Sequence, residues 1–303
     1  MKLIRKHHGR MKESFLKYLQ YEKRCSPHTV KAYGIDLEQF YNFLLETYEV
    51  SDIKEVNHSF IRSWIISMME ESITPRSINR KITTLKTYYK FLLREGVITQ
   101  NPMLKIQSPK TSKRLPVFVD KTNMDQLLDH IEFTEDYTGR RDKFIIELFY
   151  VTGMRLAELV NLKVESLDLY NNSLKVLGKR NKERIIPFSH TMKDLIIKYI
   201  ESRNSIENSK NSDYLFLTPK GIQIKRKMVQ TLVKKYLGMV STIDKKSPHV
   251  LRHSFATNML NNGADINSVK EILGHASLAA TQVYTHNTIE KLKNIYKQAH
   301  PKA

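Results

Sequence analysis

The residues best suited to chemistry in this 303-residue sequence are basic, and several gather in one short segment. Ser247 and Pro248 form a helix-start signal, so His249, Arg252 and His253 fall at positions i, i+3 and i+4 of one helix face. Three groups that can carry positive charge repel one another unless an anion lies between them. His249 also falls in the first turn, where the helix dipole favours an anion. The spacing therefore favours an anion site over a core histidine beside a surface arginine.

A second cation, Arg155, follows Gly153 and Met154 at the junction of two helical stretches in an apolar setting. A guanidinium group is costly to bury unless an anion compensates for the lost water. That anion is either a bound partner or a neighbouring carboxylate. On local sequence alone, a salt bridge to Glu158 or Glu165 is the simpler interpretation.

Three further residues have types suited to catalysis but weaker local signals. Lys179 follows Gly178 at the tip of a predicted hairpin, where a lysine is usually solvated but can also act as a mobile acid. His275 follows Gly274, a predicted helix-ending glycine that can direct the ring into a cleft. Tyr284 is one of 15 tyrosines, and its spacing alone predicts a core residue.

The net charge of the chain indicates a polyanionic partner. There are 50 Lys and Arg against 31 Asp and Glu, a formal charge of +19. The excess is divided almost evenly, because residues 1–113 carry 20 basic and 11 acidic side chains and residues 114–303 carry 30 and 20. We therefore expect both halves to face the polyanion.

Several protein classes are excluded by residue types that the sequence lacks. A single cysteine, Cys25, rules out a disulfide framework and a cysteine-based zinc site. No uncharged apolar run reaches the roughly 18 residues of a membrane helix, and no apolar segment follows the basic N-terminus, so we expect a cytoplasmic protein with no membrane partner. There is no Walker loop, His-Glu-x-x-His pair or carboxylate cluster. We expect no metal, no cofactor and no small-molecule substrate.

Two domains are expected from the pattern of apolar residues. The first is a helical N-terminal domain, residues 1–104. Apolar residues follow a helical period after three start signals, Ser26-Pro27, Asn57 or Ser59, and Thr74-Pro75. Four helices with short connections predict a small bundle, whose inward positions include Leu45 and Met69. Its basic residues form either a solvated face or part of the polyanion site; they are Arg62, Arg76, Arg80, Lys81, Lys86 and Lys90.

Residues 105–114 predict a basic linker, because they are polar, contain a proline and four basic residues, and have no periodicity. Beyond the linker, residues 115–303 form the second domain. Runs at 173–178 and 183–188 flank a polar turn and predict a hairpin. The expected fold class is therefore mainly α with a small antiparallel β-sheet. The expected helices cover 122–131, 140–152, 156–162, 191–202, 225–238, Pro248 to Gly263, Asp265 to Gly274, 277–285 and 288–298.

Five motifs occur in order along the second domain: TGMRLAEL, LGKRNKERIIP, SPHVLRHSFATNML, LGHASLAATQVYTH and the final HPKA. Together they resemble the tyrosine site-specific recombinases, and specifically the Xer type of bacterial chromosomes, XerC and XerD. The segment CSPHTVKAYGIDLEQF is similar to the core-binding domain of the same family, so the resemblance covers nearly the whole chain. It implies an N-terminal four-helix DNA-binding domain and a C-terminal tyrosine recombinase catalytic domain.

The resemblance implies catalytic roles for six residues, Arg155, Lys179, His249, Arg252, His275 and Tyr284. Tyr284 is implied to attack a DNA phosphodiester, giving a 3′-phosphotyrosyl link and a free 5′-hydroxyl. Arg155 and Arg252 are implied to hold the non-bridging oxygens. The link conserves bond energy, so rejoining needs neither ATP nor a metal.

The three remaining roles concern protons and hydrogen bonds. His249 is implied to assist removal of the tyrosine proton, and His275 to donate a hydrogen bond to the phosphate. Lys179 is implied to protonate the leaving 5′-oxygen.

The implied partner is double-stranded DNA, bound by a tetramer on two DNA sites, with a sister Xer recombinase and an activating DNA translocase as further candidates. Family members exchange a C-terminal helix between neighbours, and segment 288–298 is either that helix or an ordinary intramolecular one. The expected function is resolution of chromosome dimers at a terminus-region site before cell division. The alternatives are an integrase or transposase of a mobile element with the same chemistry, and a DNA-binding protein without catalysis.

Overall fold

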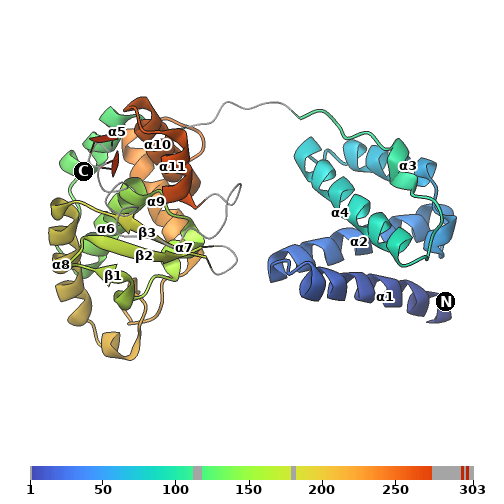
Figure 1. Ribbon diagram of the computed structural model, residues 1–303, viewed down its shortest axis with the longest axis horizontal. Coiled ribbons are helices and arrows are strands. Elements are labelled where there is room, and N and C mark those ends of the chain that lie inside the picture. The colour runs from blue at the N-terminus through green and yellow to red at the C-terminus, as the bar shows by residue number, and fades with distance from the viewer. Residues whose placement is uncertain (1, 112–117, 179–181, 275–294, 297, 300–303) are drawn as a thin grey trace. The chain divides into compact units, whose positions relative to one another are not determined.

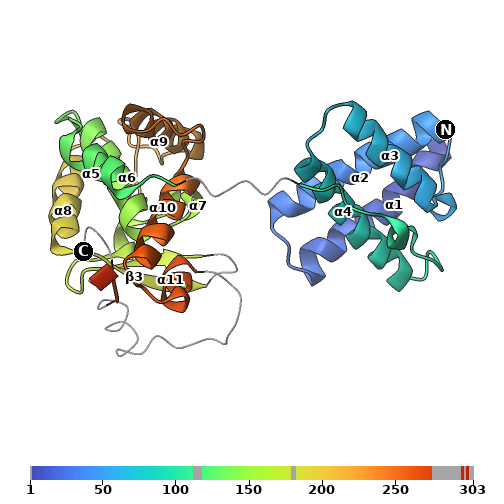
Figure 2. The same cartoon turned by 90° about the horizontal axis from the view of Figure 1, so that it is seen from above.

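The computed structural model describes residues 2–111, 118–178, 182–274, 295–296 and 298–299. The chain divides into two compact units, Met1–Arg114 and Leu115–Ala303 (Figures 1 and 2). The expected fold class is confirmed, because helices dominate and the described residues form one sheet of three antiparallel strands. Within these ranges, no helix has the length and apolar character needed to cross a membrane.

The described residues of the N-terminal unit form four α-helices. They are α1 Lys2–Lys17, which continues into a π-helical turn at Tyr18–Glu22, α2 Pro27–Tyr48, α3 His58–Glu70 and α4 Pro75–Arg94. The predicted start signals are confirmed at Ser26 and Thr74, and of the alternatives Asn57 and Ser59 the cap is Asn57. Each of these three side chains accepts a hydrogen bond from a backbone N–H in the first turn that follows. These caps satisfy donors that a helix start leaves unpaired.

The core of this unit corrects two predicted inward positions. Leu45 and Met69 are 38% and 47% exposed, whereas Leu44 and Met68 beside them are buried. Helical spacing marks an apolar stripe but does not tell which edge of the stripe meets a neighbouring helix. Ile106 also packs into this core, so the start of the predicted linker contacts the N-terminal unit.

A buried ion cluster joins α2 to α4. Asp36 is fully buried and accepts hydrogen bonds from both terminal nitrogens of Arg80, from Lys81 Nζ at 3.1 Å and from Thr84 Oγ1 at 2.8 Å. Lys81 is only 7% exposed, so its predicted place on a basic face is wrong. The Arg80 side chain is about half exposed, so it can form part of the predicted basic face.

The C-terminal unit contains the sheet and the remaining helices. The helices are α5 Lys121–Asp125, continued by a π-helical turn at Gln126–His130, α6 Tyr137–Thr152, α7 Leu156–Val160, α8 His190–Asn204, α9 Arg226–Val240, α10 Pro248–Asn261 and α11 Ile266–Leu273. The predicted hairpin is confirmed, with β2 Ser173–Leu177 antiparallel to β3 Glu183–Pro187. A third strand, β1 Leu167–Asp168, pairs with β2. Two residues are too few for an alternating pattern, so the sequence does not predict this strand.

Helix α6 is central to this unit, since most of its residues are buried and it contacts α8, α9 and α10. Helix α11 contacts both α10 and β3 (Figures 1 and 2). The predicted helix 277–285 and most of segment 288–298 lie outside the described residues. Of that last segment, Ile295 and Tyr296 are helical and pack against the core of their own unit.

Candidate active site

Arg155 is positioned by the sharp end of α6. Gly153 follows Thr152 in the left-handed region, at φ +57°, which favours glycine. A Cβ atom at Gly153 would lie 2.5 Å from a ring carbon of Phe255 and 2.8 Å from a methyl group of Leu273. Glycine therefore lets the end of α6 approach α10 and α11 closely, and the chain then places Arg155 as the N-cap residue of α7.

Arg155 forms the salt bridge that its local sequence favours. Its Nη1 atom lies 2.8 Å from Oε1 of Glu158, and its backbone N–H donates to Oε2 of Glu158 at 2.8 Å. Glu165, the other candidate, pairs instead with Lys163 at 3.4 Å. The second terminal nitrogen of Arg155 donates to the carbonyl of Gly274 at 3.1 Å. The Arg155 side chain stays 37% exposed, so it is anchored and still reachable from solvent.

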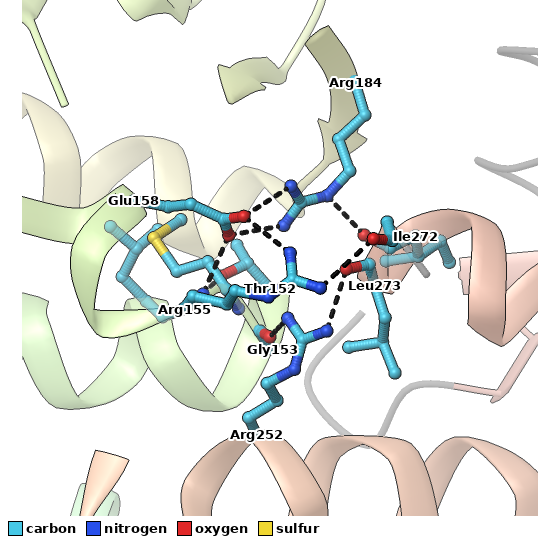
Figure 3. Close-up of polar contacts among 11 residues, drawn as sticks. Thr152, Gly153, Arg155, Glu158, Arg184, Arg252, Ile272 and Leu273 are labelled. Atoms are coloured by element: carbon cyan, nitrogen blue, oxygen red, sulfur yellow. Dashed lines mark hydrogen bonds and ion pairs between the residues drawn. The ribbon is translucent and has the colours of Figure 1, made fainter. Parts of the chain in front are cut away.

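Arg252 on α10 approaches the same point and is only 6% exposed. Its terminal nitrogens donate to the carbonyls of Gly153, at 2.7 Å, and Leu273, at 2.8 Å. Burial lowers the pKa of Arg252 to about 10, helped by the charge of Arg155 and opposed by Glu158. The group therefore remains charged at neutral pH. Figure 3 shows the guanidinium groups of Arg155, which precedes α7, and of Arg252, on α10, converging on the end of α11.

A third arginine, Arg184 on β3, belongs to the same cluster. Its terminal nitrogens donate to the two carboxylate oxygens of Glu158 at 3.1 and 2.8 Å, and its Nε donates to the carbonyl of Ile272 at 2.7 Å. Burial raises the pKa of the Glu158 carboxyl, but hydrogen bonds from Arg184 and Arg155 and the charge of Arg184 outweigh burial, and the pKa falls below its ordinary value. Glu158 is therefore a carboxylate shared by two guanidinium groups.

Neither Arg184 nor the shared role of Glu158 emerged from the sequence. One signal was available, because Arg184 alternates with Ile186 on the inward side of β3 and both are buried. An arginine at an inward strand position needs a buried partner. The sequence does not tell which carboxylate supplies it.

The cluster has the charge of an anion site. Three guanidinium groups surround one carboxylate, which leaves a formal surplus of two positive charges. The consecutive carbonyls of Ile272, Leu273 and Gly274 each accept a hydrogen bond from a different arginine. These carbonyls lie at the negative end of α11, so they fix the arginines in place without neutralising them. Fixed planar guanidinium groups suit an oxyanion such as a phosphate.

The two predicted histidines of α10 differ from Arg252 in their surroundings. His249 is exposed in the first turn, and His253 is half-buried. Their predicted contribution to the anion site stays a prediction.

The other predicted site residues cannot be compared with this geometry. Lys179, His275 and Tyr284 lie outside the described residues. The residues just before two of them are described. Gly274 has a φ of +65° and is the C-cap residue of α11, and Gly178 directly follows β2. In the described ranges, no three His, Cys, Asp or Glu side chains gather as a metal site would require.

Comparison with known proteins identifies the family of the chain. Residues 117–291 match the phage integrase family, and residues 13–96 match the phage integrase N-terminal SAM-like domain. The tyrosine recombinase XerC of Chlorobaculum parvum is 38% identical, over 96% of this chain and 94% of the relative. The tyrosine recombinase XerD of Listeria monocytogenes is 37% identical, over 96% of this chain and 98% of the relative.

Solved structures share the fold. The XerH site-specific recombinase bound to palindromic difH substrate, in its post-cleavage complex, matches with a TM-score of 0.71 and 20% identity, over 93% of this chain and 83% of that one. The Tn1549 transposon integrase with circular intermediate DNA matches with a TM-score of 0.67 and 19% identity, over 93% of this chain and 98% of that one. With nearly full-length identity of 37–38% to curated recombinases, the chain belongs to the phage integrase family of tyrosine recombinases, enzymes that cut and rejoin DNA.

Proposed function

We propose that this protein is a site-specific recombinase of the Xer type that resolves chromosome dimers at a terminus-region DNA site before cell division. The proposal is supported by identity to XerC and XerD over almost the whole of both chains. Integration of a mobile element uses the same chemistry. The likeness to the transposon integrase, at 19% identity, supports only the fold.

The convergence of Arg155 and Arg252 is the observation that carries the proposed chemistry. In the proposed reaction these two arginines hold the non-bridging oxygens of the scissile phosphate. The Oη atom of Tyr284 bonds to phosphorus while the bond from phosphorus to the 5′-oxygen breaks. Negative charge on the phosphoryl oxygens rises in the transition state, and fixed guanidinium groups stabilise it without reorganising.

The proton movements are assigned to three other residues. A tyrosine hydroxyl has an ordinary pKa of about 10, so it needs a base to react at neutral pH. We assign that base to His249, and we assign to Lys179 the acid that protonates the leaving 5′-oxygen. His275 donates a hydrogen bond to the phosphate. Attack by a new 5′-hydroxyl reverses these steps and releases Tyr284.

The proposed partner is double-stranded DNA, bound by both units. Support comes from the even division of positive charge, +9 and +10 on the two halves of the chain. The XerH relative was solved with its difH DNA. We further propose a tetramer on two DNA sites, with a sister recombinase and a translocase as partners to be tested.

Covalent trapping tests this proposal. The full chain is incubated in EDTA with a nicked suicide duplex that carries the terminus-region palindromic site of the host. We expect a protein–DNA adduct with the wild type and with Tyr170→Phe, a control at a tyrosine that is 93% exposed, and none with Tyr284→Phe. An adduct that forms only on a mobile-element end would assign the protein to integration. Tight binding with no adduct on either DNA, even with a sister recombinase added, would contradict the proposed catalysis.

A further inference from the structure

Arg184 is the buried residue of the cluster for which the proposed chemistry has no role. It is 4% exposed and lies on β3, whereas Arg155 is the N-cap residue of α7 and Arg252 lies on α10. A buried guanidinium group is expensive unless its donors are satisfied. The groups that satisfy Arg184 are the carboxylate of Glu158 on α7 and the carbonyl of Ile272 near the end of α11.

Its first link is to Arg155, through Glu158. Oε1 of Glu158 accepts from Nη1 of both arginines, and Oε2 accepts from Nη2 of Arg184 and from the backbone N–H of Arg155. Glu158 is only 5% exposed, so Arg184 is its buried counter-charge and Arg155 the partly exposed one (Figure 3). Without Arg184 the carboxylate loses two of these hydrogen bonds and is free to shift towards Arg155.

Its second link is to the end of α11. The Nε atom of Arg184 holds the carbonyl of Ile272, and a Cβ atom added to Gly274 would lie 3.2 Å from Cδ of Arg184. The side chain of Arg184 therefore packs directly against the residue before His275. A Cβ atom added to Gly178, the residue before Lys179, would lie 3.6 Å from Nη1 of Arg184.

We propose that Arg184 is a positioning residue of the recombination reaction, which fixes Arg155 through Glu158 and fixes the end of α11 through the carbonyl of Ile272. This inference rests on the proposed function, in which Arg155 contacts the scissile phosphate. Because it acts through other groups, Arg184 affects the rate of the chemical step more than the affinity for DNA. A displacement of about 1 Å in a catalytic group costs on the order of 10²-fold in rate.

The variants Arg184→Lys and Arg184→Gln test this role. Lysine keeps the charge but has neither the two parallel donors nor the Nε donor, and glutamine removes the charge as well. The matched control is Arg203→Lys on α8. Arg203 is also 4% exposed, but its partners among the described residues are the carbonyls of Ser212, Tyr214 and Leu215. Both replacements remove a buried guanidinium group, and only one touches Glu158.

The measurement is the first-order rate of adduct formation on the nicked duplex at saturating DNA, with the DNA dissociation constant measured separately. We expect the rate to fall about tenfold for Arg184→Lys and about 10²-fold for Arg184→Gln, with DNA affinity within threefold of wild type. Arg203→Lys should keep the wild-type rate below its melting temperature. A folded, DNA-binding Arg184→Lys protein that cleaves within threefold of wild type would overturn the inference.

A double-mutant comparison tests the route through Glu158. If Arg184 acts through that carboxylate, the rate losses of Arg184→Lys and Glu158→Gln do not multiply in the double variant. Losses that multiply contradict the route. Arg155→Ala in the same assay separates the two proposals: if it cleaves at the wild-type rate, the proposed function of Arg155 fails. If it is slow while Arg184→Lys is fast, only the present inference fails.

Discussion

Replacing Glu158 with glutamine should destabilise the C-terminal unit more than any single surface change. The carboxylate accepts four hydrogen bonds, at 2.8, 2.8, 3.1 and 2.8 Å, from Arg155 and Arg184. Glutamine has one acceptor oxygen, and its amide group can only donate, so at least two of these bonds are lost. The change also raises the formal surplus of the cluster from two positive charges to three.

The expected magnitude follows from the burial of the two partners. Removing one member of a buried ion pair costs about 3–5 kcal/mol. The Arg184 side chain is 5% exposed and feels the full loss, whereas that of Arg155 is 37% exposed and is partly screened by water. We therefore expect the free energy of unfolding to fall by about 3 kcal/mol at pH 7. For a unit of this size that lowers the melting temperature by about 6–12 °C.

The effect should depend on pH in a defined direction. The folded-state pKa of Glu158 is below its ordinary value, so the carboxylate stabilises the fold above that ordinary value, about 4.3. This contribution disappears as the pH falls through the lower folded-state pKa. The difference in stability between wild type and Glu158→Gln should therefore be full at neutral pH and shrink in acid.

Denaturant unfolding followed by circular dichroism at pH 7 and in acid measures both effects. The control is Glu165→Gln, because Glu165 is 77% exposed and its 3.4 Å pair with Lys163 lies at the surface. We expect this control to stay within about 0.5 kcal/mol of wild type. The reasoning is refuted if Glu158→Gln is equally close to wild type at pH 7, or if its deficit does not diminish in acid.

Three other changes give direct tests. Arg155→Ala should slow adduct formation by about 10²–10³-fold, as expected for loss of a transition-state donor, and a rate within tenfold of wild type contradicts its assignment. Asp36→Asn leaves two cations of α4 without their buried counter-charge and should lower the stability of the N-terminal unit by about 3 kcal/mol. The fluorescence of Trp64, the single tryptophan, reports that loss, and an unchanged midpoint refutes it. Gly153→Ala combines a positive φ with a Cβ atom 2.5 Å from Phe255 and should cost about 2 kcal/mol or more, measured as a drop in melting temperature.

The sequence by itself determined the features that depend on near neighbours in the chain. The caps at Ser26, Asn57 and Thr74 form within a few residues, and the structure confirms all three. The hairpin of β2 and β3 is similarly local. The bridge between Arg155 and Glu158 spans three residues, so local spacing was enough to nominate it, though not to choose it over Glu165. The resemblance to the family could be recognised from five motifs in a fixed order, and that recognition requires no knowledge of the tertiary structure.

Only the tertiary structure decided which charges meet. Arg184 is 26 residues from Glu158 and 88 from Ile272, and its partners are set by tertiary contacts, including the packing of β3 against α11. Lys81 looked like a surface cation because helical spacing does not reveal Asp36, 45 residues away, beneath it. Leu45 and Met69 lie on apolar stripes but remain exposed to solvent. In each case the deciding energy is the desolvation of a side chain, which depends on what packs against it and not on its neighbours in sequence.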